Sequence, residues 1–328
     1  MSTISFPRRF DRDTLTGFFA ELDQCQAEPE VRLDCSTLRY SFPTAMLVAG
    51  SKIRTWVSKR HKDGLTTRKA GYQTLRDVHS YLSHLGFFDY ILMGEGNAVG
   101  AARGSSTYLP ITRLNKPEFD ADSSTTVWYD QIHSAVRGLA RVVSGTVEDN
   151  EENRLYTYAF REIVRNAFEH SGADECYVCG QRWYNGKVEI AIVDEGVGVT
   201  GSLRQSFDID TDVDALNLAI QPGKSRTTFT DTSENIYDNS GFGLYVLSEI
   251  AKSFGWYVFG SGESRIVNAT GGYSVTEALK FKGTYFGMQI QNPPSQFSGL
   301  IKDIIAAGED EAEASGIATK ASGMSKFI

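Results

Sequence analysis

The sequence predicts an α/β protein in which a smaller N-terminal α/β domain (1–120) precedes a larger C-terminal domain (127–295) and a tail (296–328). First, segments with apolar residues at helical spacing alternate with short strand-like segments. Second, 328 residues are enough for one large domain or two ordinary ones. Third, 41% apolar and 23% charged residues are typical of a chain with a packed core.

The N-terminal segment alternates strands and helices. We expect a strand at Val31–Tyr40, a helix at Ala45–Trp56, a helix at Tyr72–Leu85 that ends before Gly86, and a strand at Tyr108–Leu114. No set of residues in this segment indicates catalysis.

A polar segment with one proline, Lys116–Thr126, predicts a linker or long loop. Helices are expected at Val127–Val143 and Glu151–His170, and two glutamates at the start of the second suit a helix N-terminus. A hairpin follows, with strands Glu175–Trp183 and Lys187–Asp194 joined through Asn-Gly, a strong tight-turn signal. The apolar residues of its second strand share one face: Val188, Ile190 and Ile192.

Residues 199–240 are polar and without clear periodicity, which predicts a long functional or mobile loop. A helix is expected at Phe242–Phe254. The last strands are expected at Tyr257–Ser261, Ser264–Ala269 and Thr284–Gln291. The composition after Asp310 predicts a disordered or loosely held end.

Charge and composition exclude several classes of protein. A net charge of −8 argues against nucleic-acid binding through a broad basic face. No apolar run approaches the length of a membrane span, and the first residues lack the apolar core of a signal peptide. Four cysteines in so long a chain indicate no disulfide framework. We therefore expect a soluble, cytoplasmic protein that does not use a membrane.

The pair Cys176-x-x-Cys179 is one half of a familiar metal-binding spacing. A metal site would need a second pair of ligands, and the sequence shows none at a suitable spacing. The surrounding ECYVCGQRW alternates like a strand, so the two cysteines would face opposite sides of a sheet. We interpret them as ordinary strand cysteines.

The helix predicted at 151–170 carries a stripe of polar residues. Glu162, Asn166 and His170 are spaced i, i+4, i+8 and lie at the edge of its apolar stripe, where a helix can line a pocket. An amide oxygen suits Mg²⁺, which usually binds beside nucleotide phosphates. A carboxylate one turn earlier can deprotonate a water or hydroxyl. The same stripe would also suit a solvated helix face.

Asp194 ends a predicted strand and is followed by Glu-Gly-Val-Gly. Gly196 and Gly198 would let the backbone approach a flat ligand closely, and a carboxylate at the base of a pocket can accept a hydrogen bond from an exocyclic amine such as that of adenine. The alternative is a turn aspartate before a glycine bend.

A second glycine cluster opens the helix at 242–254. Backbone N–H groups at a glycine-rich helix start, here Ser240, Gly241 and Gly243, bind phosphate well. Before it, Gly-Lys-Ser at 223–225 imitates the end of a Walker phosphate loop. That loop would need glycine at Leu218, so we reject it. Lys224 would still reach phosphates from a mobile lid, or would simply be solvated.

Taken together, these motifs resemble the GHKL superfamily of ATP-binding domains, which includes gyrase, the large heat-shock chaperone, histidine kinases and mismatch-repair ATPases. The resemblance covers about Glu151 to Asn292. RExxxNAxxH at Arg161–His170 is similar to the N box, DEGVGV at Asp194–Val199 to the first glycine box, and SGFGLYVL at Ser240–Leu247 to the second. LKFKGTYFGMQI at Leu279–Ile290 resembles the closing strands, where a Gly-Thr precedes the last one.

The resemblance implies a two-layer α/β sandwich of the Bergerat type, with a mixed sheet and helices on one face. It implies ATP and Mg²⁺ as cofactors, with residues 199–240 as the lid over the nucleotide. Asp194 would contact the adenine amine and Asn166 would hold Mg²⁺. The other residues implied at the nucleotide are Gly196, Gly198, Lys224, Ser240, Gly241, Gly243 and Thr284.

The N box also separates the subfamilies. Histidine kinases usually lack a base at the position of Glu162, and His133 in DQIHSAVRGLA is not in the usual phosphoacceptor context. Glu162 resembles the catalytic glutamate of the hydrolysing members, and ExxxNAxxHS is similar to the N box of anti-sigma-factor serine kinases. In the N-terminal segment, LDCSTLRYSFPTAMLVAGSKIRTW is similar to STAS-type modules, which are partners of such kinases; an unrelated α/β segment is the alternative.

Three functions remain open. The first is an Mg²⁺-dependent ATPase whose nucleotide state switches a conformation or a protein partner. The second is a protein serine/threonine kinase of the anti-sigma-factor type. The third is an interaction module that holds ATP without hydrolysing it. Glu162 favours the first two, which share one requirement for positioning and electrostatics. A homodimer is compatible with all three.

Overall fold

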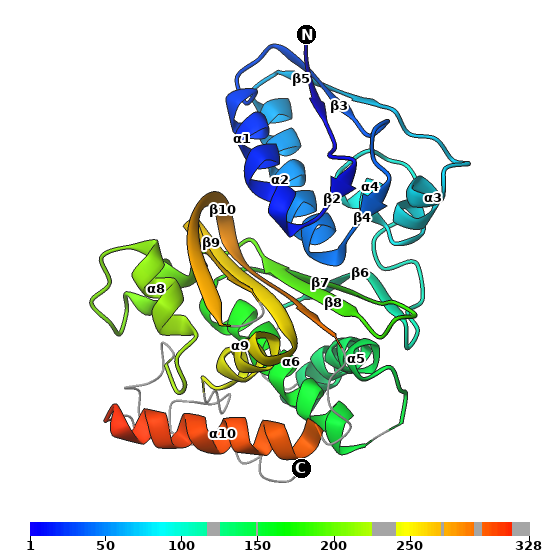
Figure 1. Cartoon of the computed structure of the whole chain (residues 1–328). Coiled ribbons are helices and arrows are strands. Elements are labelled where there is room, and N and C mark those ends of the chain that lie inside the picture. Colours follow the sequence, from blue (N-terminus) through cyan, green and yellow to red (C-terminus); the bar gives the residue numbers. More distant parts are fainter. Residues whose placement is uncertain (117–124, 149, 225–240, 270–271, 292–296, 317–328) are drawn as a thin grey trace.

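A computed structural model describes residues 1–116, 125–148, 150–224, 241–269, 272–291 and 297–316. Figure 1 shows an N-terminal unit above a central sheet, with a layer of helices below the sheet. The α/β class is confirmed, since helices and strands alternate along the chain.

The N-terminal unit is built around a parallel three-stranded sheet with the order β1-β3-β5. Its longest helix, α2 (Pro43–Lys62), begins at a proline in the first turn, where the missing N–H costs nothing. The other elements are β1 (Ser2–Ser5), β2 (Arg9–Phe10), η1 (Arg12–Thr14), α1 (Leu15–Gln24), β3 (Glu30–Asp34), β4 (Tyr40–Ser41), β5 (Thr66–Ala70), α3 (Asp77–His84) and α4 (Phe87–Tyr90).

The central sheet has five strands in the order β6-β7-β8-β10-β9. Its strands are β6 (Tyr108–Asn115), β7 (Glu175–Arg182), β8 (Val188–Asp194), β9 (Gly255–Ala269) and β10 (Tyr273–Ile290). Every described ladder of this central sheet is antiparallel, so the predicted mixed sheet is wrong. The strands β7 and β8 form one hairpin and β9 and β10 form another, so the ladder within each hairpin is antiparallel. Strand β10 then lies beside β8 and runs in the opposite direction.

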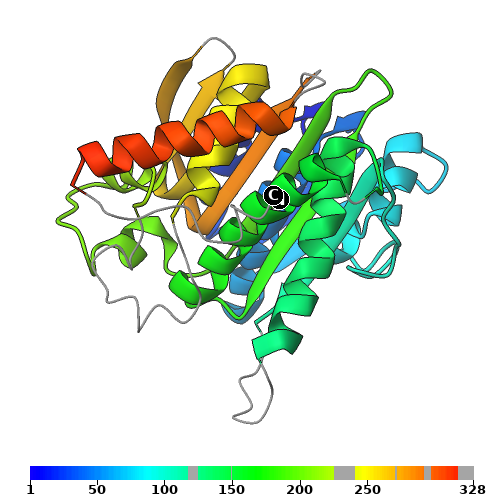
Figure 2. The ribbon, with the colours of Figure 1, turned by 90° about the horizontal axis from the view of Figure 1, so that it is seen from below.

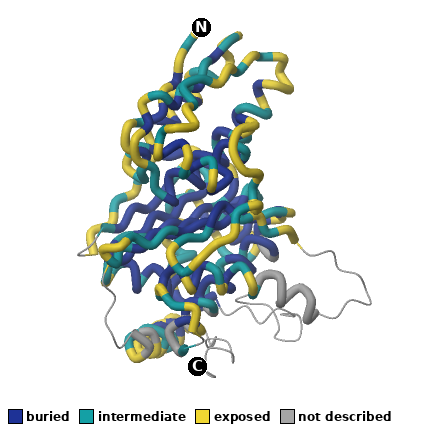
Figure 3. Tube along the Cα trace, turned by 90° about the vertical axis from the view of Figure 1, so that its right-hand side faces the viewer, coloured by how far each residue is buried: buried dark blue, intermediate teal, exposed yellow. Residues whose placement is uncertain are grey.

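Both faces of this sheet are buried. The lower face packs on α5 (Thr125–Ser144), α6 (Glu151–His170) and α9 (Gly243–Phe254), through residues that include Val188, Ile190 and Ile192. The upper face packs on the N-terminal unit, chiefly on α2. Figure 3 shows the buried trace continuing from the sheet into both layers. The prediction placed helices on one face of the sheet. It accounts for the lower face but not for the N-terminal unit that covers the upper face.

The two strand cysteines confirm the alternation expected of β7. Cys176 is buried among the residues of the lower face and Cys179 among those of the upper face. Neither forms a disulfide, and because they lie on opposite faces of the sheet the two thiols do not converge as one ligand set.

The predicted division at residue 120 put β6 with the N-terminal segment. In the structure β6 instead pairs with β7 and forms one edge of the central sheet. Most of the predicted linker at 116–126 lies outside the described residues.

Two predicted irregular regions contain helices. Within 199–240, the chain forms α7 (Gly198–Leu203) and α8 (Asp212–Ala219); the latter begins with a capping box between Thr211 and Asp214, and residues 225–240 lie outside the described part. The predicted loose end after Asp310 is in part α10 (Phe297–Ala314), which packs against α9 and α6, as Figure 2 shows from below. Within the described residues, no helix is long and apolar enough to span a bilayer.

Candidate functional site

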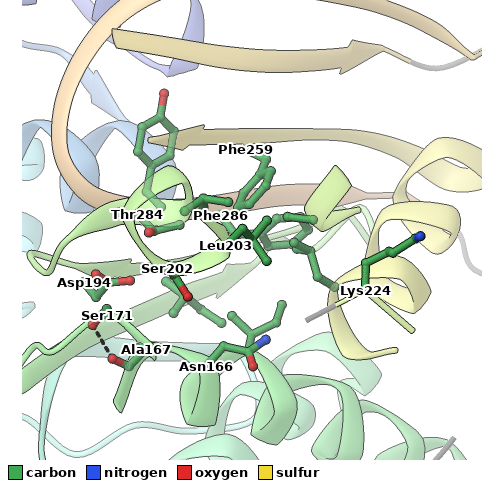
Figure 4. Close-up of a pocket in the computed structure, with 17 residues that line it drawn as sticks. Asn166, Ala167, Ser171, Asp194, Ser202, Leu203, Lys224, Phe259, Thr284 and Phe286 are labelled. Atoms are coloured by element: carbon green, nitrogen blue, oxygen red, sulfur yellow. Dashed lines mark hydrogen bonds between the residues drawn. The ribbon is translucent and has the colours of Figure 1, made fainter. Parts of the chain in front are cut away.

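A pocket lies between the lower face of the central sheet, α6 and α7 (Figure 4). Its volume is about 110 Å³, whereas one water molecule requires roughly 10–15 Å³, so the pocket has room for an organic group. Five of the predicted site residues line it: Asn166, Asp194, Gly198, Lys224 and Thr284.

Asp194 is the acid of this pocket. Its residue is 6% exposed, and its Oδ1 accepts a hydrogen bond from the Gly196 N–H at 2.9 Å. Burial raises the pKa of Asp194 to about 7, although the polar groups of Gly196, Ser171 and Thr284 around it oppose the shift. The carboxyl group is therefore held in an apolar wall with its orientation fixed by the Gly196 N–H.

Thr284 reaches the same place from the neighbouring strand. It lies directly opposite Asp194 in the antiparallel ladder between β10 and β8. The preceding Gly283 has a φ of +96°, and a Cβ there would lie 2.1 Å from the Asp194 carbonyl oxygen. The Gly-Thr pair thus allows β10 to close against the end of β8.

The glycines of DEGVGV are required for close packing. A Cβ on Gly196 would lie 2.2 Å from the carbonyl oxygen of Ser171, and Val197 N–H donates to that same oxygen at 2.7 Å. Gly198 has a φ of +78° and begins α7, whose next N–H donates to Ser261 Oγ at 2.9 Å. This turn binds the end of α6 to the end of β8, which forms one wall of the pocket.

Asn166 enters the pocket from α6, and its residue is partly exposed. Across the described part of the chain, no three His, Cys, Asp or Glu side chains cluster as metal ligands. An ion held here would therefore take most of its ligands from water and from a bound anion, which is the way Mg²⁺ usually binds with nucleotide phosphates.

Glu162 lies one turn before Asn166 on α6 but is not among the pocket-lining residues. Its residue is 1% exposed, and its carboxylate pairs with the buried Arg165 guanidinium at 3.3 Å. The first residue of α9, Gly243, packs directly over it, since a Cβ there would lie 2.2 Å from the Glu162 Cβ. The glycine at 243 therefore serves the contact between α6 and α9.

The cationic end of the pocket is at Lys224, whose Nζ lies 5.6 Å from the centre of the Phe207 ring. Gly241, with a φ of +69°, packs on the backbone of Gly223 and Lys224. The second glycine cluster is thus next to Lys224, although they are separated in sequence. Ser240 lies outside the described residues.

Several pocket residues were not predicted. Ser171 ends α6, and its hydroxyl accepts the Ala173 N–H at 3.0 Å and donates to the Ala167 carbonyl oxygen. Ser202 is a second unpredicted polar residue of the lining, and the others form the apolar walls: Ile163, Ala167, Ile192, Val199, Leu203, Ala219, Leu244, Phe259, Tyr285 and Phe286. Ser171 could have been noted as a small polar residue directly after a helix. The apolar residues carry no signal of their own, because any core position has the same pattern.

The arrangement suits a flat, partly apolar ligand that carries a hydrogen-bond donor at one end and negative charge at the other. No known family model matches this chain, and no curated protein matches it.

Proposed function

We propose that this pocket binds ATP and that nucleotide binding is the primary activity of the protein. The observation that carries the proposal is Asp194, a buried carboxyl group in an apolar wall with Thr284 beside it. The adenine ring would lie against the apolar residues, with its exocyclic amine donating to the carboxylate. A buried polar group of this kind rejects a ring that lacks the matching donor.

The phosphates would extend toward Asn166 and Lys224. Mg²⁺ would be held by the Asn166 amide oxygen together with water and phosphate oxygens, and it would supply charge neutralisation. Lys224 would add a point charge at the phosphates. Gly241, packed on the backbone of Lys224, would fix the position of the helix start beside them.

Titration calorimetry with ATP and Mg²⁺ tests the proposal. Asp194→Asn should weaken binding about 10- to 150-fold, because the acceptor loses its charge and the new side-chain NH₂ group cannot accept from the adenine amine. The matched control is Asp208→Asn, which makes the same change at an exposed residue between α7 and α8 and should bind as the wild type does. A folded wild-type protein that gives no heat with MgATP would overturn the proposal.

Whether bound ATP is turned over depends on Glu162. As an ATPase or a serine kinase, the protein would use this carboxylate as the base, and ATP turnover would switch a conformation or a partner. The buried pair between Glu162 and Arg165 favours the other candidate, a module that holds ATP without hydrolysing it. For turnover, the carboxylate would have to leave Arg165 and face the γ-phosphate.

Incubation with γ-labelled ATP, alone and with a cell lysate, separates these candidates. Free phosphate indicates an ATPase, a labelled protein band indicates a kinase, and neither product indicates a binding module. Either product should disappear in Glu162→Ala while ATP binding persists; undiminished product would exclude Glu162 as the base.

A further inference from the structure

The N-terminal unit contacts the residue directly after the pocket carboxylate. Glu195 follows Asp194 in the chain, but its side chain turns to the opposite side of the sheet and meets α2. There its Oε1 lies 2.8 Å from Arg54 Nη2 and accepts a hydrogen bond from Ser51 Oγ at 2.5 Å. Two side chains one turn apart on α2 thus hold one carboxylate of the first glycine turn.

Arg54 is itself held in place by aromatic rings. Its guanidinium lies 4.5 Å from the centre of the Tyr177 ring and 5.1 Å from that of Tyr90, and it donates to the Tyr177 hydroxyl. The Tyr177 hydroxyl in turn donates to Glu175 at 2.5 Å. The Arg54 side chain is only 21% exposed and that of Glu195 only 22%, so the ion pair is largely shielded from water.

This ion pair adjoins the groups that orient Asp194. The backbone of Glu195 connects Asp194 to Gly196, whose N–H donates to the Asp194 carboxylate. It is also closely packed, since a Cβ on Gly283 would lie 2.7 Å from the Glu195 Cα. Because there is no free space around the Glu195 backbone, a movement of its side chain is transmitted to the turn that holds the Asp194 carboxylate.

We propose that Arg54 is a positioning residue for the nucleotide pocket, and that through Glu195 the N-terminal unit sets the affinity of the C-terminal domain for ATP. This inference rests on the proposed function of the pocket. The N-terminal unit and the pocket that would bind the nucleotide are then coupled through the Arg54–Glu195 ion pair, so a ligand that moved α2 would change ATP affinity.

The test is the affinity for MgATP of the full chain with Arg54→Met, which keeps an unbranched side chain but removes the cation. Coupling through such contacts is on the order of a 2- to 30-fold change in affinity, and we expect weaker binding within that range. Arg54→Lys should recover part of the loss, because a cation stays within reach of Glu195.

Lys52→Met is the matched control. Lys52 is on the same helix and is similarly shielded, and it pairs with Asp23 at 2.7 Å within the N-terminal unit. Its Nζ also donates to the Lys280 carbonyl oxygen on β10 at 3.4 Å, so this variant tests whether any cation between α2 and the sheet matters or whether the pair with Glu195 is required. Its replacement should leave ATP affinity unchanged. Thermal unfolding without nucleotide measures any general loss of stability in both variants.

A double-mutant cycle shows whether Arg54 acts through Glu195. Glu195→Gln alone should weaken binding, and adding Arg54→Met to it should have little further effect. Additive losses, or an Arg54→Met protein that binds ATP as the Lys52→Met protein does, would overturn the inference while leaving the proposed function intact. A wild-type protein that binds no ATP would overturn both.

Discussion

Two buried carboxyl groups on β8 face opposite sides of the sheet. Asp194 faces the pocket, whereas Glu189, an odd number of residues away, faces the N-terminal unit and is 2% exposed. Glu189 Oε1 accepts the N–H of Thr44 in the first turn of α2 at 3.0 Å, where the N-cap residue Phe42 supplies no side-chain acceptor. Glu189 therefore caps α2 from another part of the chain.

Glu189 makes stability depend on pH. Burial raises its pKa from an ordinary 4.5 to about 7, although Thr44, Lys187 and Arg12 oppose the shift. A carboxyl group whose pKa is raised on folding stabilises the fold below its ordinary pKa, and that stability is lost as the pH rises through 7. Between pH 5 and pH 8 the wild type should lose up to about 3 kcal/mol relative to Glu189→Gln, which does not titrate but still accepts the Thr44 N–H.

Urea unfolding at both pH values measures this difference. Glu21→Gln, at an exposed position of α1, corrects for the general effect of removing a carboxylate. Parallel pH dependence in the wild type and in Glu189→Gln would contradict the prediction.

At the scale of elements, the contact between α6 and α9 is limited by one glycine. A methyl group at residue 243 would lie 2.2 Å from the Glu162 Cβ and 3.0 Å from the Ala159 carbonyl oxygen. Because neither group can move without its helix, Gly243→Ala should destabilise the protein by roughly 1–3 kcal/mol.

Gly17→Ala is the comparison for this substitution. Gly17 lies inside α1, where an added Cβ would meet nothing within 4 Å, so the same change should stabilise the protein by roughly 0.4–1 kcal/mol. Chemical denaturation of both variants measures the opposite signs; equal effects would show that helix propensity, and not the contact between helices, controls residue 243.

Elements were predictable where the signal is local. The α6 bounds agree with the prediction because Asn150 caps its N-terminus, and the β7–β8 hairpin was predicted from its Asn-Gly turn. The strands β9 and β10 were predicted as shorter pieces, since two irregularities between Ala278 and Thr284 interrupt the alternation, although pairing continues beyond them. Helix α8 was missed because it is short and its periodicity is weak.

At the scale of the whole molecule, the upper face of the central sheet makes the two parts interdependent. Buried apolar residues on this face would meet water without the N-terminal unit; they include Tyr177, Ala191, Val193, Val258 and Tyr285. A fragment that begins at residue 105 should therefore aggregate or bind a hydrophobic dye strongly, because exposed apolar patches of this kind promote association.

Size-exclusion chromatography of this fragment beside the full chain tests the prediction. A monomeric fragment that unfolds at the temperature of the full chain would show that the two parts are independent domains. That result would also remove the structural basis for coupling through Arg54.

Local sequence signals were enough to predict helix α6, the β7–β8 hairpin, the alternation of the two cysteines, and the residue types of the candidate site. These follow from short-range periodicity, caps and turns, which depend on neighbours in the chain. The tertiary structure alone shows that Asp194 and Thr284 lie opposite each other, that α9 packs over Glu162 at Gly243, and that α2 reaches Glu195. Those contacts join residues brought together by sheet order and burial, which the local pattern of a sequence does not encode.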